Sequence, residues 1–373
     1  MPILSSCSRA SMLLAKLGPL TRSAPSMLAA VRRRWRGSAW WSWRGVFVRR
    51  VPPLSLREAN PESLTAELAA ALAKVGVTRI SLGVQTLDNA ELTAIGRIHD
   101  ADRALAAITT VKDAGLDVSC DLMCGLPGQT AVSWQRTLDG VLAAAPHHVS
   151  VYPLTLEEGT PLYRMACRDE SLEPDEDFQA ACMDVARELL GAAGYHPYEV
   201  ASYALDGHEC AHNIAYWTGR GYLGLGRSAA GMLDAEDFDR LAGLFPGASS
   251  RGDAYRVRLV QRDDDATVFE AEYLSQREAA AEDLMLACRM TRGVASDLLV
   301  RVARVIPADG LTAACDRALE LGLATWVPET LGVHEGPFTS ADVVAGHVRA
   351  RLAPTHLGWL DGNMLFELFW DLA

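Results

Sequence analysis

Short β-rich runs recur over the first part of the chain, and between them the apolar positions follow the wider spacing of helices. We predict four strands, at Leu54–Asn60, Arg79–Gln85, Val118–Cys124 and His148–Thr155. We predict helices in the intervening and following stretches, at Pro61–Val75, Ala90–Arg97, Ala101–Ala114, Ala131–Ala145 and Pro174–Ala193. Strands that alternate with helices in this way indicate parallel strand–helix–strand units with right-handed crossovers.

The pattern changes along the remainder of the chain. Residues 195–260 are mixed and rich in loop signals. From Ser275 onward the pattern is helical, with a β-like pair near Leu323–Val327 and Leu357–Leu360, which favours a small helical domain of winged-helix type. The sequence therefore predicts an α/β fold in three parts: an atypical segment at 1–54, an α/β part at 55–260 and a helical domain at 275–373.

One face of each predicted strand is small or polar, because successive side chains point to opposite faces. Near the strand ends this face carries Glu58, Gln85 and Asp121. Branched apolar residues fill a purely structural barrel, so polar interior positions indicate a cavity for a ligand. Since barrel ligands bind at the C-terminal ends of the strands, we predict that these three residues, with Arg97 from the next connection, bind one. Any one of these residues, taken alone, could instead be a polar residue at a strand end whose hydrogen bonds are made within the protein.

Length and composition allow a barrel-sized domain and a smaller one, with 373 residues of which 49% are hydrophobic and 22% charged. No run reaches the roughly 18 consecutive apolar residues that a membrane-spanning helix needs. Eight cysteines occur without a Cys-x2-Cys pair, which favours a reducing compartment, and we predict the cytoplasm.

The charge is unevenly distributed. Residues 1–57 hold eleven of the 35 basic residues and no acid, so 24 basic and 47 acidic residues remain, a balance of −23. Such a negative body is a poor nucleic-acid binder. The basic opening has three interpretations: an organelle transit peptide, which would make the protein mitochondrial, an isolated nucleic-acid arm, or a segment that is not native coding sequence.

Ordered sequence blocks give the chain a resemblance to a known family. They are Glu-Ala-Asn-Pro-Glu-Ser (58–63), Arg-Ile-Ser-Leu-Gly-Val-Gln (79–85), Gly-Arg-Ile-His (96–99), Asp-Leu-Met-Cys-Gly-Leu-Pro-Gly-Gln-Thr (121–130), Leu-Glu-Glu-Gly-Thr-Pro (156–161), His-Asn-Ile-Ala-Tyr-Trp (212–217) and Tyr-Leu-Gly-Leu-Gly (222–226). From about Ser55 onward the chain resembles the radical-SAM group of HemW-type heme chaperones and oxygen-independent coproporphyrinogen III dehydrogenases. The blocks at 96–99 and 212–217 look more like the chaperone branch.

The resemblance implies an incomplete barrel of six parallel strands with S-adenosylmethionine across its top, and a HemN-like helical C-terminal domain. By position, Glu58 would meet the amino group and Arg97 the carboxylate of the methionine part. Gln85 and Asp121 would contact the nucleoside, Asp121 through the ribose hydroxyls. Thr130 would be the N-cap of the helix after the Gly-Leu-Pro-Gly-Gln-Thr turn.

The resemblance also implies a [4Fe–4S] cluster, held by a Cys-x3-Cys-x2-Cys motif that this sequence lacks. Cys7 is alone in residues 1–57. Cys120 and Cys124 lie within a predicted strand, roughly 13 Å apart at ~3.3 Å per residue, too far to share one cluster, so we expect them to pack in the core. The family's Gly-Gly-Thr-Pro-Ser turn is also missing, since residues 23–26 read Ser-Ala-Pro-Ser. We predict no metal ligands here.

Heme is the second ligand that the resemblance implies. His212 could bind its iron while Tyr216 and Trp217 stack on the macrocycle; alternatively the three residues are structural. Relatives place a histidine where this chain has Ala230. Three hypotheses remain: a HemW-like protein that binds heme and delivers it to an acceptor protein, a coproporphyrinogen III dehydrogenase of porphyrin biosynthesis, and an inactive truncated remnant.

Overall fold

A computed structural model describes residues 28–31, 56–225, 228–245, 247–248, 250–263, 268–329 and 337–373. The chain divides into two compact units, each with its own core. The barrel unit is Val51–Ala211, and the C-terminal unit combines His212–Ala373 with Met1–Arg50. Apart from 28–31, the predicted atypical segment 1–54 lies outside the described residues. The boundaries that we predicted at 54, 260 and 275 stay predictions.

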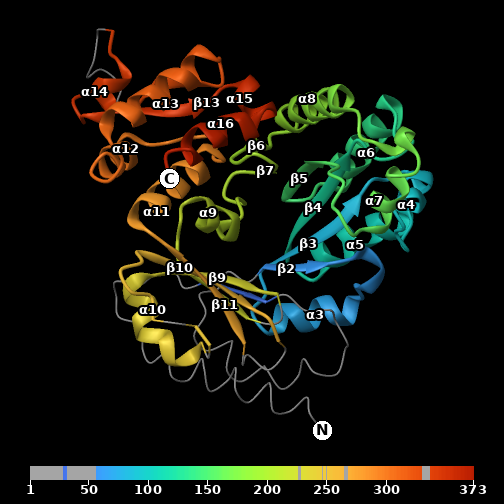
Figure 1. Ribbon diagram of the computed structural model, residues 1–373. Helices are drawn as coiled ribbons and strands as arrows, with labels where there is room; N and C mark the ends of the chain where they lie inside the picture. Colours follow the sequence, from blue (N-terminus) through green and yellow to red (C-terminus); the bar gives the residue numbers. More distant parts are fainter. Residues whose placement is uncertain are drawn as a thin grey trace. The chain divides into compact units, whose positions relative to one another are not determined.

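The barrel unit contains a six-stranded sheet in the order β2-β3-β4-β5-β7-β6 (Figure 1). The strands are β2 (Leu56–Ala59), β3 (Arg79–Gln85), β4 (Asp117–Cys124), β5 (His148–Pro153), β6 (His196–Pro197) and β7 (Ser202–Ala204). The first four are parallel, which confirms the incomplete parallel barrel. β7 is antiparallel to β5 and to β6, unlike the all-parallel barrel that the resemblance implied. The reason is local: a short connection without a helix joins β6 to β7, and short connections pair strands antiparallel.

Helices lie between these strands and cover the sheet. They are α3 (Ala66–Lys74), α4 (Asn89–Ala94), α5 (Ala101–Asp113), α6 (Ala131–Ala144), α7 (Pro161–Ala166) and α8 (Glu176–Ala192), with 3-10 turns at Pro61–Ser63 and Glu170–Leu172. α5 packs on β3 and β4, and α8 packs on β4 and β5. The buried face of β3, formed by Ile80, Leu82 and Val84, belongs to this core. The predicted N-cap Thr130 is confirmed, because its side chain accepts from the backbone of Ser133.

A second sheet belongs to the C-terminal unit, in the order β1-β8-β9-β10-β11. Its strands are β1 (Leu28–Val31), β8 (Tyr222–Leu225), β9 (Ala230–Asp234), β10 (Arg256–Gln261) and β11 (Phe269–Leu274). α9 (Ala211–Trp217) precedes β8, and α10 (Ala235–Leu241) follows β9. Leu233, Phe238 and Val257 form the core between this sheet and α10. The hydrophobic pattern of this region is mixed, because most of these strands are short and lie between loops.

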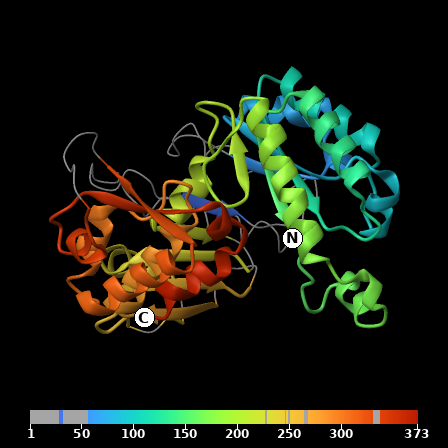
Figure 2. The ribbon, with the colours of Figure 1, turned by 90° about the horizontal axis from the view of Figure 1, so that it is seen from above.

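The last hundred residues are mainly helical, as predicted. The helices are α11 (Gln276–Cys288), α12 (Ser296–Val302), α13 (Ala308–Glu320), α14 (Ser340–Val344), α15 (His356–Leu360) and α16 (Gly362–Trp370). They form one group in both views, in orange and red (Figures 1 and 2). No helix in the described part of the chain is long and apolar enough to cross a lipid bilayer.

One strand of the predicted pair in this region is wrong. β12 (Ala324–Pro328) agrees with the first prediction, but it pairs with β13 (Ala350–Pro354), while the predicted strand Leu357–Leu360 is helix α15. Thr355 caps that helix by accepting from the Gly358 amide at 3.1 Å. A Cβ at Gly358 would lie 1.8 Å from the Leu323 carbonyl oxygen, so a close tertiary approach fixes the helix start.

Candidate functional site

A row of polar side chains crosses one face of the barrel unit's sheet. The strand register pairs Glu58 with Ser81, and Asp121 with Ser150. The Ser81 hydroxyl donates to Asp121 Oδ2 at 2.8 Å. One strand further on, the hydroxyls of Ser150 and Ser202 lie 3.2 Å apart. Five neighbouring strands therefore bring hydroxyl and carboxyl groups together where a structural barrel would place branched apolar residues.

Asp121 is the electrostatic centre of this row. Burial raises its pKa to about 6, although hydrogen bonds from Ser81 and Ser150 favour the ionised form. The negative charge of Glu58 adds to the increase, which places the two predicted ligand residues within electrostatic reach of each other. Asp121 thus changes charge near neutral pH, and a group that donates hydrogen bonds to it or carries positive charge would hold it ionised.

The other two predicted ligand residues, Gln85 and Arg97, lie near Gly83 and Asn60. A Cβ at Gly83 would lie 2.9 Å from Gln85 Nε2 and 3.7 Å from Asn60 Oδ1, so both side chains cover this glycine. Arg97 Nη1 donates to Asn60 Oδ1 at 3.3 Å. Gln85 has a positive φ of 66°, an uncommon conformation for a residue with a side chain. The register shift between Leu82 and Gln85 accompanies that turn of the backbone.

The structure therefore brings the four predicted residues onto one face in two adjoining groups. Glu58 and Asp121 belong to the polar row. Arg97 contacts Asn60, two residues after Glu58, and Asn60 lies with Gln85 over Gly83. Arg97 has a neutral partner in Asn60, and no carboxylate among the described residues forms an ion pair with it. Sequence reasoning gave no role to Asn60, although it shares a face with Glu58. It also left Ser150 out, whose only signal is its position in a strand.

A buried carboxylate holds the loop after β4. Glu91, 3% exposed, accepts from Thr86 at 2.6 Å, from Gln129 at 3.2 Å and from Ser133. The side-chain Oε1 of Gln129 in turn accepts from the Gly125 amide at 2.7 Å. This network fixes the Gly-Leu-Pro-Gly-Gln-Thr turn at the C-terminal end of β4, beyond Asp121. The sequence did not reveal Glu91, since its partners are distant along the chain.

His99 also has a structural environment. Its Nδ1 lies 3.2 Å from Glu62 Oε2 and its Nε2 lies 3.4 Å from the carbonyl oxygen of Val84. The ring is buried and joins the loop after β2 to the end of β3. His99 therefore supports the site without facing it.

The cysteines of β4 are packed in the core. Cys120 and Cys124 are both fully buried on the strand that the sequence predicted. Burial raises the pKa of the Cys120 thiol and raises that of Cys124 to about 12, so both stay protonated. Among the described residues no three His, Cys, Asp or Glu side chains gather to hold a metal. The described residues do not fit an iron–sulfur cluster.

The candidate heme residues lie on α9 of the C-terminal unit. The His212 and Tyr216 rings meet edge-on with centroids 4.7 Å apart, and Tyr216 meets Tyr222 in the same way at 4.4 Å. Trp217 faces another partner, because the Arg289 guanidinium lies 5.1 Å from its ring centroid. His212 and Tyr216 are half-buried. The helix thus joins His212 and Tyr216 in one aromatic row and turns Trp217 toward Arg289.

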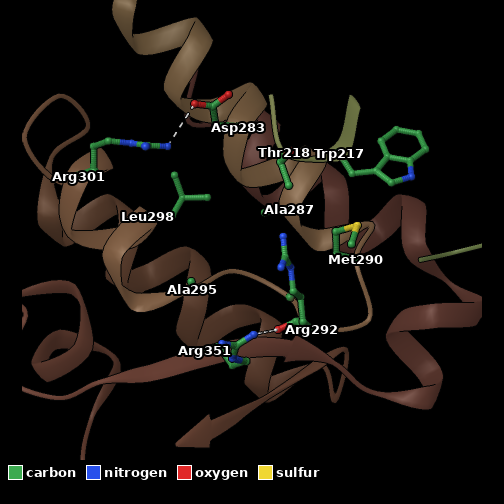
Figure 3. A pocket seen from close by; sticks show the side chains of 11 residues that line it. Trp217, Thr218, Asp283, Ala287, Met290, Arg292, Ala295, Leu298, Arg301 and Arg351 are labelled. Carbon is green, nitrogen blue, oxygen red and sulfur yellow. Dashed lines mark hydrogen bonds and ion pairs between the residues drawn. The ribbon is translucent and has the colours of Figure 1, made fainter. Parts of the chain in front are cut away.

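A hollow of about 260 Å³ lies beside Trp217 in the same unit (Figure 3). Its lining includes Trp217 at the end of α9, Thr218 just after it, Asp283 on α11, and Arg292 in the loop after α11. Arg301 on α12 and Arg351 on β13 complete the polar part. No sequence pattern indicated this hollow, because its arginines come from three separate segments.

Comparison with known proteins agrees with this architecture. Residues 58–141 match the Radical SAM superfamily, so the barrel unit carries a radical SAM domain. The chain is 38% identical over 177 residues to the heme chaperone HemW of Mycobacterium tuberculosis, covering 47% of this chain and 45% of that protein. It is 35% identical over 223 residues to the HemW of Synechocystis, covering 59% and 52%. The radical S-adenosyl methionine domain-containing protein 1, mitochondrial, of Bos taurus is 39% identical, covering 47% and 40%.

A solved structure shows the same fold. The coproporphyrinogen III oxidase HemN of Escherichia coli superposes with a TM-score of 0.69 at 16% identity, covering 99% of this chain and 83% of that one. Residues 58–141 thus carry a radical SAM domain. The chain is similar in sequence to HemW heme chaperones and in fold to HemN. It spans about half the length of the curated relatives that it matches.

Proposed function

We propose that this chain is a HemW-like protein that binds S-adenosylmethionine in its barrel unit and heme in its C-terminal unit, for delivery to an acceptor protein. The observation that carries the first half is the joint placement of Glu58, Asp121, Gln85 and Arg97 on one face of the sheet. The names of the HemW relatives support the second half.

The chemistry of the barrel face suits a zwitterion joined to a nucleoside. The Arg97 guanidinium, held by a neutral amide, would bind the ligand carboxylate, and the exposed Glu58 carboxylate would bind the amino group. Asp121 would accept from the two ribose hydroxyls, and Gln85 would contact the base. Hydrogen bonds from the two ribose hydroxyls favour the ionised form of Asp121. Below about pH 6 the carboxyl is protonated in the ligand-free protein, so binding would release this proton.

The heme half of the proposal rests on His212. Its half-buried imidazole lies beside Tyr216, whose ring could cover one side of a macrocycle, while His212 would supply an axial nitrogen. We propose no radical oxidation for the chain, since reductive cleavage of S-adenosylmethionine requires a cluster. The predicted cytoplasmic location stays a prediction, and mitochondria are the alternative that the name of the bovine relative supports.

Calorimetric titration tests the nucleoside half. Arg97→Ala should weaken S-adenosylmethionine binding by about 10-fold to 100-fold, the loss of one charge-assisted contact. Asp121→Asn should weaken it as well and should remove its pH dependence between pH 5 and 7. Arg136→Ala, on the exposed side of α6, is the matched control and should bind normally. A chain that binds S-adenosylmethionine with equal affinity after both site substitutions does not use this face.

Hemin titration tests the other half. The wild-type chain should shift the Soret band of hemin, and His212→Ala should weaken binding and change the band position. Failure of the wild-type chain to bind hemin would leave the inactive remnant as the better description. Pull-down of an acceptor protein by the hemin-loaded chain, and not by the hemin-free chain, tests delivery.

A further inference from the structure

A line of hydrogen bonds leads from Asp121 to a buried histidine of the same unit. The Ser150 hydroxyl bonds to Asp121, and the hydroxyls of Ser150 and Ser202 lie 3.2 Å apart. Ser202 in turn bonds to the phenol of Tyr198, whose oxygen lies 2.9 Å from His148 Nε2. Ser150, Ser202 and His148 are each at most 2% exposed, so these groups bond to one another rather than to water.

The His148 ring is neutral and carries a single proton. Burial, together with the positive charge of Arg79, lowers its pKa to about 3. Both ring nitrogens have partners, because Nδ1 lies 2.8 Å from the Ser119 hydroxyl and Nε2 lies 2.9 Å from the Tyr198 oxygen. A neutral imidazole donates through one nitrogen and accepts through the other. The ring therefore donates to one of these hydroxyls and accepts from the other.

Counting protons gives the hydrogen-bond line one direction when Asp121 is ionised. A carboxylate only accepts, so Ser150 donates its single proton to Asp121. Ser150 must then accept from Ser202, and Ser202 must accept from Tyr198. The phenol has no second proton, so His148 Nε2 donates to it. Every donor of the line thus points toward Asp121.

Tyr198 is held in place at the centre of the line. Its oxygen accepts from the Cys210 amide at 3.2 Å, and its ring meets the His148 ring edge-on with centroids 5.7 Å apart. Burial and the negative charge of the buried Glu199 raise the pKa of the phenol, so it keeps its proton. With two donors on its oxygen, the phenol directs this proton toward Ser202.

The surroundings of Asp121 leave part of its acceptor capacity free. Ser81 donates to its Oδ2 from β3 at 2.8 Å, and Ser150 donates from β5. An ionised carboxylate has about four acceptor positions, so about two remain for the hydroxyls of a diol. The titratable groups that face it from the neighbouring strands are Glu58 on β2 and Tyr152 on β5. The charge of Glu58 opposes ionisation, and the two serine donors act against it.

We propose that Tyr198 and His148 are positioning residues for the ribose contact of Asp121. Through Ser202 and Ser150 they direct a line of donors at the carboxylate, which supports its ionised form and orients it for a diol. Hydrogen bonds in series polarise one another where the dielectric constant is low, so a distant donor affects the last acceptor. The inference rests on the proposed function, because it concerns the same contact.

The tautomer of His148 tests the direction of the line without any substitution. At pH 7.5, where Asp121 is mostly ionised, nitrogen-15 NMR of the wild-type chain should find the ring proton on Nε2. A proton on Nδ1 would mean that the ring donates to Ser119 and away from Tyr198. That result overturns the proposal.

Substitutions along the line test its effect on Asp121, measured by carbon-13 NMR of labelled aspartate. Ser150→Ala removes the direct donor and should raise the pKa of Asp121 from about 6 to about 7. Tyr198→Phe removes a more distant donor and should raise it by about 0.3 to 0.5. Its affinity for S-adenosylmethionine should fall by about 2-fold at pH 6 and by less at pH 8. Tyr195→Phe is the matched control, because it removes a buried phenol bond outside the line, to the Pro146 carbonyl oxygen at 2.5 Å, and should leave this pKa unchanged.

The outcomes separate this inference from the proposed function. Equal pKa values of Asp121 in Tyr198→Phe and Tyr195→Phe overturn the hydrogen-bond line and leave the proposed function standing. Absence of S-adenosylmethionine binding by the wild-type chain overturns the proposed function and with it the ribose contact, even where the pKa values follow the line. Circular dichroism shows whether each variant is folded, and the tautomer of the wild-type chain decides the matter if Tyr198→Phe is not.

Discussion

At the scale of single residues, Asp121 shows how the sheet places a carboxyl group where it resists ionisation. Its pKa rises to about 6 because it is largely removed from water, and Ser81 compensates only in part with one hydrogen bond of 2.8 Å. The folded protein therefore holds this proton at a pH where the unfolded chain has released it. This difference connects the candidate site to stability.

We expect Asp121→Asn to become more stable relative to the wild type as the pH rises. The folded pKa lies above the unfolded value of 3.8, so the stabilising contribution is complete below about pH 4 and is lost as the pH rises to about 6. The loss should be about 3 kcal/mol at 1.36 kcal/mol per pKa unit. Thermal unfolding of both proteins from pH 4 to 7.5, followed by circular dichroism, measures the difference. A difference that stays constant over this range contradicts the expectation.

Glu91 should be among the residues of the barrel unit that tolerate substitution least. Glu91→Ala removes the acceptor for Thr86, Gln129 and Ser133, so we expect a loss of about 3 kcal/mol in the free energy of unfolding. Hydrogen exchange should accelerate in residues 86–137. Glu188→Ala, at an exposed position of α8, is the control and should change stability by less than about 0.5 kcal/mol. Equal stability of the two variants would show that the network is dispensable.

At the scale of elements, strand β3 and helix α15 show when local pattern suffices. Every bound of β3 agrees with the prediction, because its alternation is regular and charged or polar residues flank it. α15 begins after a cap, Thr355, and contains a glycine, Gly358, that closely approaches the Leu323 carbonyl oxygen, so its short apolar run led to the wrong prediction of a strand. The antiparallel direction of β7 depended likewise on the short connection between β6 and β7, which the mixed hydrophobic pattern of this region did not define.

The glycine beside the arginine hollow gives a test at this scale. Gly293→Ala combines a positive φ with a Cβ 2.0 Å from a backbone oxygen of β13, so we expect a loss of about 3 kcal/mol. Gly310→Ala is the matched control, because it lies within helix α13 with only Leu372 at 3.9 Å, and should be neutral or stabilising by up to about 1 kcal/mol. Denaturant unfolding of the two variants compares them directly. Equal changes in the free energy of unfolding of the two variants would mean that the backbone at Gly293 can move away from β13.

At the scale of the whole molecule, the chain consists of two units that each bury a core. Ile80, Leu122 and Ile108 are fully buried in the barrel unit, and Leu233 and Val257 in the C-terminal unit. A ligand that binds one unit stabilises the folded state of that unit by mass action. The two proposed ligands should therefore act on different parts of the chain.

Hydrogen exchange with each ligand tests that division. S-adenosylmethionine at 100 times its Kd should slow exchange in residues 79–125 by an amount equivalent to about 2.7 kcal/mol. Hemin should instead slow exchange in residues 212–225. Arg97→Ala should lose the first effect and keep the second, and His212→Ala the reverse. Protection by S-adenosylmethionine confined to the C-terminal unit would contradict the assignment.

The sequence by itself determined the strand–helix order of the barrel unit, the helical character of the last hundred residues and the polar face that holds Glu58, Gln85 and Asp121. These features depend on periods of two and 3.6 and on caps, which are local properties of the chain. Only the tertiary structure decided that Asn60 contacts Arg97 and lies with Gln85 over Gly83, that Glu91 accepts from three donors and that three arginines line one hollow. Those groupings join residues far apart in the chain, and their energies depend on burial, which no local pattern specifies.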